Sequence, residues 1–176
     1  VEKDWQVDWY AMKSWSDPGE VVVSGIRFIP VAPARAMYRA DGKRSIAQTL
    51  VYGRAIAKFP RLGGYDLIHM GQWPYFHFFP VRLFALFGQA RISVDWWEVW
   101  AGHWRDYYGA KGYLGMALER LCARIPRWLV AISETGARQL AVSSNAKTRF
   151  VILADSEENE PSWRIRSYAI LKEEPG

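Results

Sequence analysis

Short apolar runs alternate with longer segments of helical periodicity through most of this sequence. The runs that predict strands are residues 66–70, 92–96, 128–132 and 149–153. The segments that predict helices run from after Pro74 to about Leu86, over 111–124, and from 133 to about 142. Parallel strands need a connection that crosses back over the sheet, and this connection is usually a helix. Strands that alternate with helices therefore indicate parallel pairing. The sequence therefore predicts an α/β fold, with a Rossmann-like three-layer parallel sheet flanked by helices.

The first third of the chain continues this pattern, and the last residues depart from it. The expected elements are a strand over 5–11, a hairpin over 21–31 and a helix over 45–59. Ser45 followed three residues later by Gln48 is the pattern of a capping box at the start of a helix. The acidic residues near the C-terminus precede a segment that could form one terminal helix. We therefore expect one domain over 1–153 and an irregular or helical tail over 154–176.

Length and composition are those of one globular domain. The chain has 176 residues, of which 50% are hydrophobic and 23% charged, so it can bury a sizeable core. Cys122 is the single cysteine, which excludes an intramolecular disulfide and favours a reducing compartment. The spacing of apolar residues over 111–124 predicts a helix with one apolar side, on which this cysteine packs. Its expected members are Leu114, Ala117, Leu118, Leu121 and Cys122.

The charge balance and the start of the chain bear on location. The net charge is +5 and the pI is about 9.4, which permits contact with phosphates or membrane head groups. The longest run without Asp, Glu, Lys or Arg, residues 67–81, is too short and too polar to span a bilayer. The opening VEKDW is not a signal peptide, and since it lacks Met, residues may precede it. We expect a cytoplasmic protein that can bind peripherally to the inner face of the membrane.

The densest aromatic stretch is VDWWEVWAGHWRDYYG, at positions 94–109. Its six rings are Trp96, Trp97, Trp100, Trp104, Tyr107 and Tyr108, and they alternate with acidic, basic and histidine side chains. Flat rings beside carboxylates suit a sugar, because rings stack on its C–H face while charged groups take its hydroxyls. The alternative is an aromatic stripe on an amphipathic helix, since the rings recur at helical spacing.

Three polar and aromatic segments follow three consecutive predicted strands. Residues 71–77 follow the strand 66–70, the aromatic stretch follows 92–96, and Ser133-Glu134-Thr135 follows 128–132. In an open parallel sheet, ligands bind beyond the carboxyl ends of the strands. The sequence therefore predicts one binding site at this edge, and we expect Trp96, Trp97 and Trp100 to shape its cleft.

Two of these segments resemble a known family. QWPYF at 72–76 and VDWWEVW at 94–100 are similar to the N-terminal domain of family 4 glycosyltransferases with the GT-B fold. The resemblance continues through LERL at 118–121 and AISE at 131–134, and GKRSI at 42–46 also resembles that family. It covers about residues 5–153 in the family's order.

The resemblance implies an activity and a missing partner domain. The family transfers a sugar from a nucleotide-sugar donor to an acceptor with retention, using two Rossmann-like domains. The acceptor binds mainly on the first domain, and the chain has neither the C-terminal donor-binding domain nor the family's first strand and helix. Trp97 also stands where the family often has histidine. We therefore expect an acceptor-binding domain that takes a glycan or lipid-linked acceptor and is inactive alone; no cofactor is expected in this chain.

The candidate site residues come from these segments. For substrate binding they are Gln72, Trp73, Tyr75, Trp97, Glu98, Trp100, His103, Ser133 and Glu134, and for phosphate binding Lys43 and Arg44. Each also has a structural interpretation: Glu98 could pair with Arg105, and Ser133 could simply cap a helix. No catalytic residue and no metal ligand are assigned, because neither a nucleophile motif nor a metal-ligand spacing is present.

A second class of function remains open. An incomplete sheet exposes edges and apolar surface, so the chain could be a non-catalytic fragment or an aromatic-rich module that docks on a partner protein or membrane. Nucleic-acid binding is not expected, because the carboxylates among the aromatic residues repel phosphates.

Overall fold

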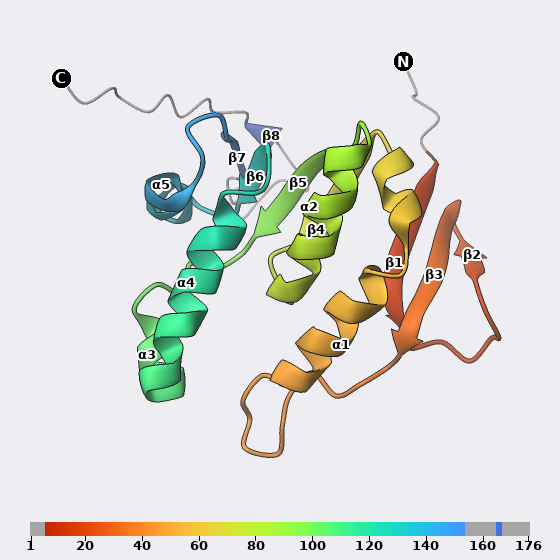
Figure 1. Ribbon diagram of the computed structural model, residues 1–176, viewed down its shortest axis with the longest axis horizontal. Helices are drawn as coiled ribbons and strands as arrows, with labels where there is room; N and C mark the ends of the chain where they lie inside the picture. The colour runs from red at the N-terminus through yellow and green to blue at the C-terminus, as the bar shows by residue number, and fades with distance from the viewer. Residues whose placement is uncertain (1–5, 154–164, 167–176) are drawn as a thin grey trace, which may run out of the picture.

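The strands of this protein form two sheets in the computed structural model, which describes residues 6–153 and 165–166 (Figure 1). The smaller sheet has the order β1-β3-β2. Its strands are β1 (Val7–Lys13), β2 (Val21–Val23) and β3 (Ile26–Pro33). β1 pairs with β3 in parallel and β2 pairs with β3 as the expected hairpin.

The larger sheet confirms the predicted α/β fold. Its order is β4-β5-β6-β7-β8. The strands are β4 (Leu67–Gly71), β5 (Arg91–Trp96), β6 (Trp128–Ala131), β7 (Arg149–Leu153) and β8 (Ile165–Arg166). The first four are parallel, and β8 runs antiparallel to β7. The expected terminal helix is therefore wrong at Ile165 and Arg166, and the rest of the expected tail lies outside the described residues.

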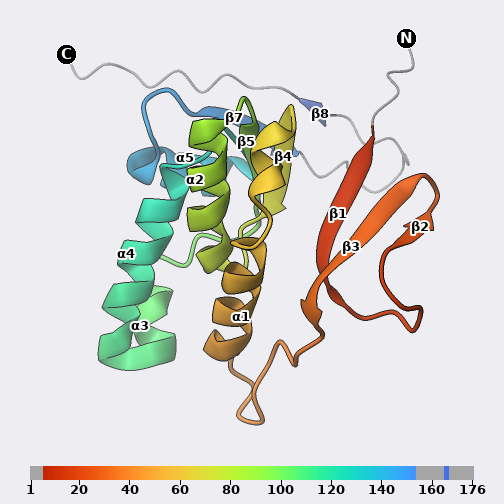
Figure 2. The same ribbon diagram turned by 45° about the vertical axis from the view of Figure 1, so that its right-hand side comes forward.

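One helix, α1 (Ile46–Ile56), leads from the smaller sheet into β4, and the other helices connect β4 to β5, β5 to β6 and β6 to β7. These others are α2 (Phe78–Phe87), α3 (His103–Tyr108), α4 (Gly112–Ala123) and α5 (Glu134–Ser143), with short 3₁₀ turns η1 (Pro60–Gly64), η2 (Tyr75–His77) and η3 (Gly109–Lys111). The strands β4 to β7 lie side by side in chain order. When each is joined to the next by a right-handed crossover, all the connecting helices lie on the same face of the sheet. Figure 2 shows α1, α2 and α4 together in front of the strands. Over residues 6–153, no helix covers the second face.

Two helices begin at the caps that the sequence predicts. Ser45 Oγ accepts a hydrogen bond from the backbone N–H of Gln48 at 3.2 Å. Ser133 Oγ accepts one from the N–H of Gly136 at 3.1 Å. Each bond satisfies a donor that the first helical turn leaves free, so the helix starts are fixed locally.

The core lies between the larger sheet and the helices. Its largest fully buried side chains include Trp96, Tyr75, Phe78, Leu129, Leu140, Val94 and Cys122. The expected packing role of Cys122 is confirmed, because the residue is buried among apolar neighbours. Burial also raises the pKa of its thiol to about 12, so the side chain stays neutral.

Helix α4 buries a different side from the one that its leucines predict. Leu114 is 75% exposed and Leu121 is 49% exposed, whereas Glu119 is buried. The reason is the close approach of Trp104: a Cβ added to Gly115 would lie 2.3 Å from that indole ring. The helix packs through its small residues, so the expectation that Leu114, Ala117 and Leu121 face the core is wrong.

The two sheets present open edges toward each other. β1 and β4 are both edge strands, and within residues 6–153 they do not pair with one another. Tyrosine side chains link them: the hydroxyls of Tyr10 and Tyr65 lie 2.9 Å apart, and the Tyr65 hydroxyl donates to Asp8.

Candidate functional site

Gln72 holds the loop that follows β5. The side chain is buried, and its Oε1 accepts the backbone N–H groups of Trp97 and Glu98, each at 3.0 Å. Its Nε2 donates to the carbonyl of Glu98 at 2.5 Å and to the Tyr75 hydroxyl at 2.7 Å. These four bonds use both donors and both lone pairs of the amide. Gln72 therefore positions the loop, and its amide is not turned toward a ligand.

Glu119 holds the next part of the same loop from inside the core. Its Oε1 accepts the N–H of Trp100 at 2.9 Å and the Tyr75 hydroxyl at 3.2 Å. Its Oε2 accepts the N–H of Ala101 at 2.9 Å and the Trp104 indole N–H at 3.2 Å. Burial and this carboxylate raise the pKa of Tyr75, so its hydroxyl remains a donor. Glu119 is not among the residues predicted for the site, and its only signal in the sequence is that of a lone carboxylate near the apolar positions of an amphipathic helix.

The fixed loop forms one wall of a pocket of about 480 Å³. The pocket is lined by Glu98, Val99, Trp100, His103, Asp106 and Tyr107. Glu98 Oε2 accepts the indole N–H of Trp100 at 2.7 Å, which holds the carboxylate beside the ring. The ring of Tyr107 meets Trp100 edge-on, with centroids 5.2 Å apart. A volume of this size falls within the range of small-molecule sites.

The rings of the aromatic stretch divide between the core and the surface. Trp96 is 1% exposed and Trp104 is 5% exposed, whereas Trp97 is 67% exposed. The expectation that Trp96 shapes the cleft is therefore wrong, because strand alternation turns it onto the core face of β5. Trp100 and Tyr107 are half-buried and line the pocket. The helical-stripe interpretation holds for Trp104 on the short α3, and the binding-site interpretation fits Trp100.

Of the two predicted phosphate-binding residues, Lys43 contacts a ring that lines the pocket, and Arg44 lies against Trp73, which does not line it. Lys43 Nζ donates to the carbonyl of Tyr107 at 3.1 Å and lies 5.5 Å from the centre of that ring. The guanidinium of Arg44 lies 5.2 Å from the ring centre of Trp73. Both cations are half-buried, so the loop before α1 brings positive charge to the aromatic wall.

The other predicted residues lie behind the pocket or away from it. Tyr75 is buried, and its hydroxyl is hydrogen-bonded to Gln72 and Glu119, the two residues that hold the loop. Trp73 is half-buried, and its ring packs against that of Tyr75. Ser133 caps α5, and Glu134 pairs with Arg138 at 3.5 Å. Neither Ser133 nor Glu134 lines the pocket. The structure thus brings together Glu98, Trp100 and His103 in the pocket, and adds Val99, Asp106 and Tyr107, which the sequence analysis did not select.

The pocket combines apolar faces with polar groups. Its aromatic walls offer flat apolar faces, and its two carboxylates and one histidine offer hydrogen-bond partners. Over residues 6–153 and 165–166, no group of three or more histidine, cysteine or acidic side chains could hold a metal ion. No described helix has the length and apolar character needed to cross a membrane. Comparison with known proteins finds neither a family model nor a curated protein that matches this chain.

Proposed function

We propose that this chain is the acceptor-binding domain of a retaining glycosyltransferase, and that its pocket binds a sugar unit of a glycan or lipid-linked acceptor. The observation that carries the proposal is the pairing of Trp100 with Glu98 in the pocket wall. A stacked sugar would meet an apolar face and a carboxylate in fixed positions. Such preorganisation lowers the cost of ordering the site when the ligand binds.

The geometry of the aromatic wall supports a sugar more than a planar base. The rings of Trp100 and Tyr107 stand at 82° to each other, so they form a corner and not a slot. A pyranose has an apolar face and a rim of hydroxyls, and it can stack on one ring while its edge contacts the other. Glu98 and Asp106 then accept hydrogen bonds from sugar hydroxyls, and His103 offers a further polar contact.

The cations beside the pocket support a role in handling the donor. Lys43 and Arg44 could attract the diphosphate of a nucleotide sugar when a second domain presents it. Catalysis would then come from positioning the reactants and from stabilising the leaving diphosphate. Because the proposed donor site belongs to a second domain, we expect no turnover of a nucleotide sugar by these 176 residues alone. The proposed setting is the cytoplasm.

A binding experiment tests the sugar site directly. Saturation-transfer NMR with a panel of hexoses, disaccharides and nucleotide sugars should show transfer from the protein to at least one sugar. Trp100→Ala should weaken that binding about tenfold, since stacking on one aromatic ring is worth about 1.4 kcal/mol. Trp9→Ala is the matched control, because Trp9 is exposed on β1 and does not line the pocket. Absence of transfer with every sugar, or equal losses in both variants, would refute the proposal.

The open sheet edges favour a second candidate function, a non-catalytic module that docks on a partner. Among the strands of the described residues, β1 and β4 each pair on one side only, and Trp9 on β1 and Leu67 on β4 are 56% and 41% exposed. Light scattering distinguishes this candidate cheaply. A monomer that shows neither self-association nor lipid binding would count against it.

A further inference from the structure

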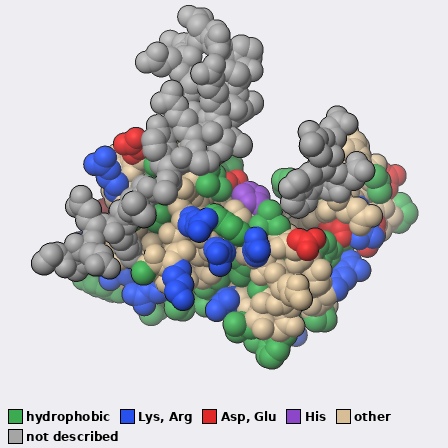
Figure 3. All heavy atoms as spheres, turned by 90° about the horizontal axis from the view of Figure 1, so that it is seen from above, with side chains coloured by type: hydrophobic (Ala, Val, Ile, Leu, Met, Phe, Trp, Pro, Cys, Tyr) green, Lys and Arg blue, Asp and Glu red, His purple; other side chains and the backbone are tan. Residues whose placement is uncertain are grey.

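Basic side chains gather at the amino-terminal end of the parallel sheet. Arg91 begins β5, Arg127 precedes β6 and Arg149 begins β7, and all three are exposed. Arg124 and Lys147 flank this row and are exposed as well. Figure 3 looks onto the end of the molecule at which these strands begin, and Lys and Arg side chains cluster on it. We call these five residues the basic end.

The three central arginines are close neighbours. The N–H of Arg127 donates to the carbonyl of Ile92 at 3.0 Å, and the N–H of Arg149 donates to the carbonyl of Arg127 at 2.9 Å. The guanidinium groups of Arg91 and Arg127 lie 5.9 and 5.5 Å from the ring centre of Trp128. Neighbouring like charges repel each other, so this arrangement carries an electrostatic cost unless an anion offsets it.

Within residues 6–153 the basic end has no carboxylate partner. The ion pairs of these residues involve Asp8, Glu20, Asp41, Asp95, Asp106 and Glu134, and none of them includes a residue of the basic end. The five cations therefore form a patch of positive charge that an external anion can neutralise.

Exposed apolar side chains border the basic end. Phe87, the last residue of α2, is 86% exposed, and Leu86 beside it is 58% exposed. The chain reaches Arg91 only four residues later. An exposed aromatic ring beside a row of arginines is the combination that membrane-surface proteins use, since the ring enters the head-group layer while the cations meet anionic lipids.

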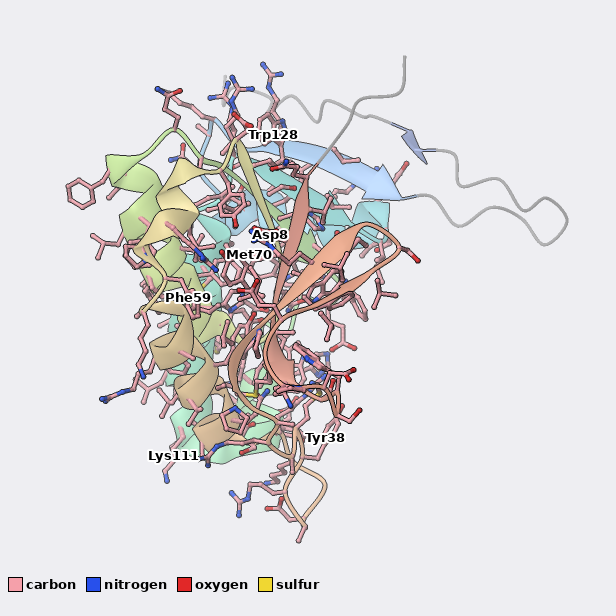
Figure 4. The ribbon with its side chains drawn as sticks, turned by 90° about the vertical axis from the view of Figure 1, so that its right-hand side faces the viewer. Asp8, Tyr38, Phe59, Met70, Lys111 and Trp128 are labelled. Atoms are coloured by element: carbon pink, nitrogen blue, oxygen red, sulfur yellow. The ribbon has the colours of Figure 1, made fainter. Side chains whose placement is uncertain are left out.

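We propose that the basic end docks on the surface of an anionic lipid bilayer. A bilayer fits better than a nucleic acid, because two guanidinium groups already occupy the ring of Trp128 and a base cannot stack there freely. Leu86 and Phe87 also gain from burial in lipid and gain nothing from phosphates. Figure 4 shows Trp128 at one end of the molecule and Lys111, beside the short helix α3, at the other. Docking therefore leaves the pocket, which includes His103, Asp106 and Tyr107 of α3, at the end of the molecule away from the bilayer, and the proposal does not depend on the sugar site.

Vesicle flotation of the full chain tests the docking surface. We expect binding to phosphatidylcholine vesicles that contain phosphatidylglycerol, little binding to pure phosphatidylcholine, and weaker binding at higher salt. The combined variant Arg91→Gln, Arg127→Gln, Arg149→Gln should bind about 100-fold more weakly, since each cation near an anionic surface contributes about fivefold. Phe87→Ser should weaken binding by about tenfold through the loss of apolar contact.

A matched variant controls for net charge. Arg105→Gln, Lys111→Gln, Arg120→Gln removes the same charge from exposed positions outside the basic end and should bind as the parent does. Circular dichroism verifies that all variants fold. The proposal is overturned if the arginine-row variant binds like the parent, if the control loses as much, or if neutral vesicles bind equally. It is also overturned if a single-stranded oligonucleotide binds more tightly than the anionic vesicles and displaces them.

Discussion

The two sides of the larger sheet hold polar clusters in opposite surroundings. On the helix-covered side, Glu119 and Gln72 are buried and bonded to several groups each. On the open side, His69 contacts Ser93 Oγ through Nδ1 and Asp95 Oδ2 through Nε2, both at 3.3 Å, and about half of its side chain is exposed. Each cluster joins side chains from more than one element of the fold. They differ in access to water.

This difference decides what each cluster can contribute. Removal of a buried carboxylate leaves its hydrogen-bond donors without partners, because water cannot reach the site to replace the lost acceptor. An exposed pair loses little, since water and salt screen it and hydrate each partner after the change. The covered cluster is therefore expected to maintain the pocket, and the open cluster to contribute little to stability.

Removal of the buried carboxylate is expected to give the largest effect. Glu119→Ala leaves four donors of the pocket loop unsatisfied, including two backbone N–H groups. We expect the free energy of unfolding to fall by about 3 to 5 kcal/mol, as measured by urea denaturation. Asp95→Ala on the open face should cost less than about 1 kcal/mol.

A milder variant keeps this test informative if Glu119→Ala does not fold. Glu119→Gln retains one acceptor oxygen and similar volume, so it should fold with an intermediate loss of stability. The near-ultraviolet circular dichroism of Trp100 and Trp104 should change in the same variant, because both indole environments depend on the carboxylate. Equal destabilisation by the substitutions at Glu119 and Asp95 would break the comparison between the two sides.

The next largest expected effect is a pH dependence of the free energy of unfolding, which comes from His77 on the helix-covered side. The residue is buried against Tyr52 and Phe78, and burial lowers its pKa to about 4. The unfolded chain binds a proton at about pH 6.5, whereas the folded chain does so only near pH 4. The stabilisation is therefore present above pH 6.5 and is lost as the pH falls toward 4. We expect a loss of about 2 to 3 kcal/mol between pH 7.5 and 4.5.

Urea denaturation at a series of pH values isolates this contribution. His77→Gln removes the titrating group, so its free energy of unfolding should fall less steeply with decreasing pH than that of the parent. The test compares the slopes of the free energy of unfolding against pH, so it remains valid even if the variant is less stable at neutral pH. An unchanged slope would show that His77 does not remain neutral in the folded protein.

The sequence predicted the framework of this molecule better than its site. The alternation of apolar runs and helical segments gave the parallel strands β4 to β7 within one or two residues, because strand burial and helix caps leave local signals. The side of α4 that faces the core was not predictable in this way. Its leucines pointed to one side, while the contact of Gly115 with Trp104 and the bonds to Glu119 selected another.

The candidate site was predicted in outline for a similar reason. The rule that ligands bind beyond the carboxyl ends of strands led to the loop after β5, and three of the residues selected there, Glu98, Trp100 and His103, line a pocket. The role of Gln72 could not be read from sequence, because a polar residue after a strand can face a ligand or turn inward to bind backbone. Only the tertiary position of residues 97 and 98 decides between these.

The smallest expected effect comes from the open side and has the opposite sign with pH. The hydrogen bond to Asp95 raises the pKa of His69 above 6.5, against the opposing effect of burial. The stabilisation is thus fully present below pH 6.5 and is lost as the pH rises through the folded pKa. Because His69 is about half exposed, screening limits it to a few tenths of a kcal/mol. NMR titration of the imidazole should give a midpoint above 6.5 in the parent and a lower one in Asp95→Asn. A midpoint at or below 6.5 in the parent would mean that the open face does not hold the pair together, and the contrast between the two sides would then be larger than proposed here.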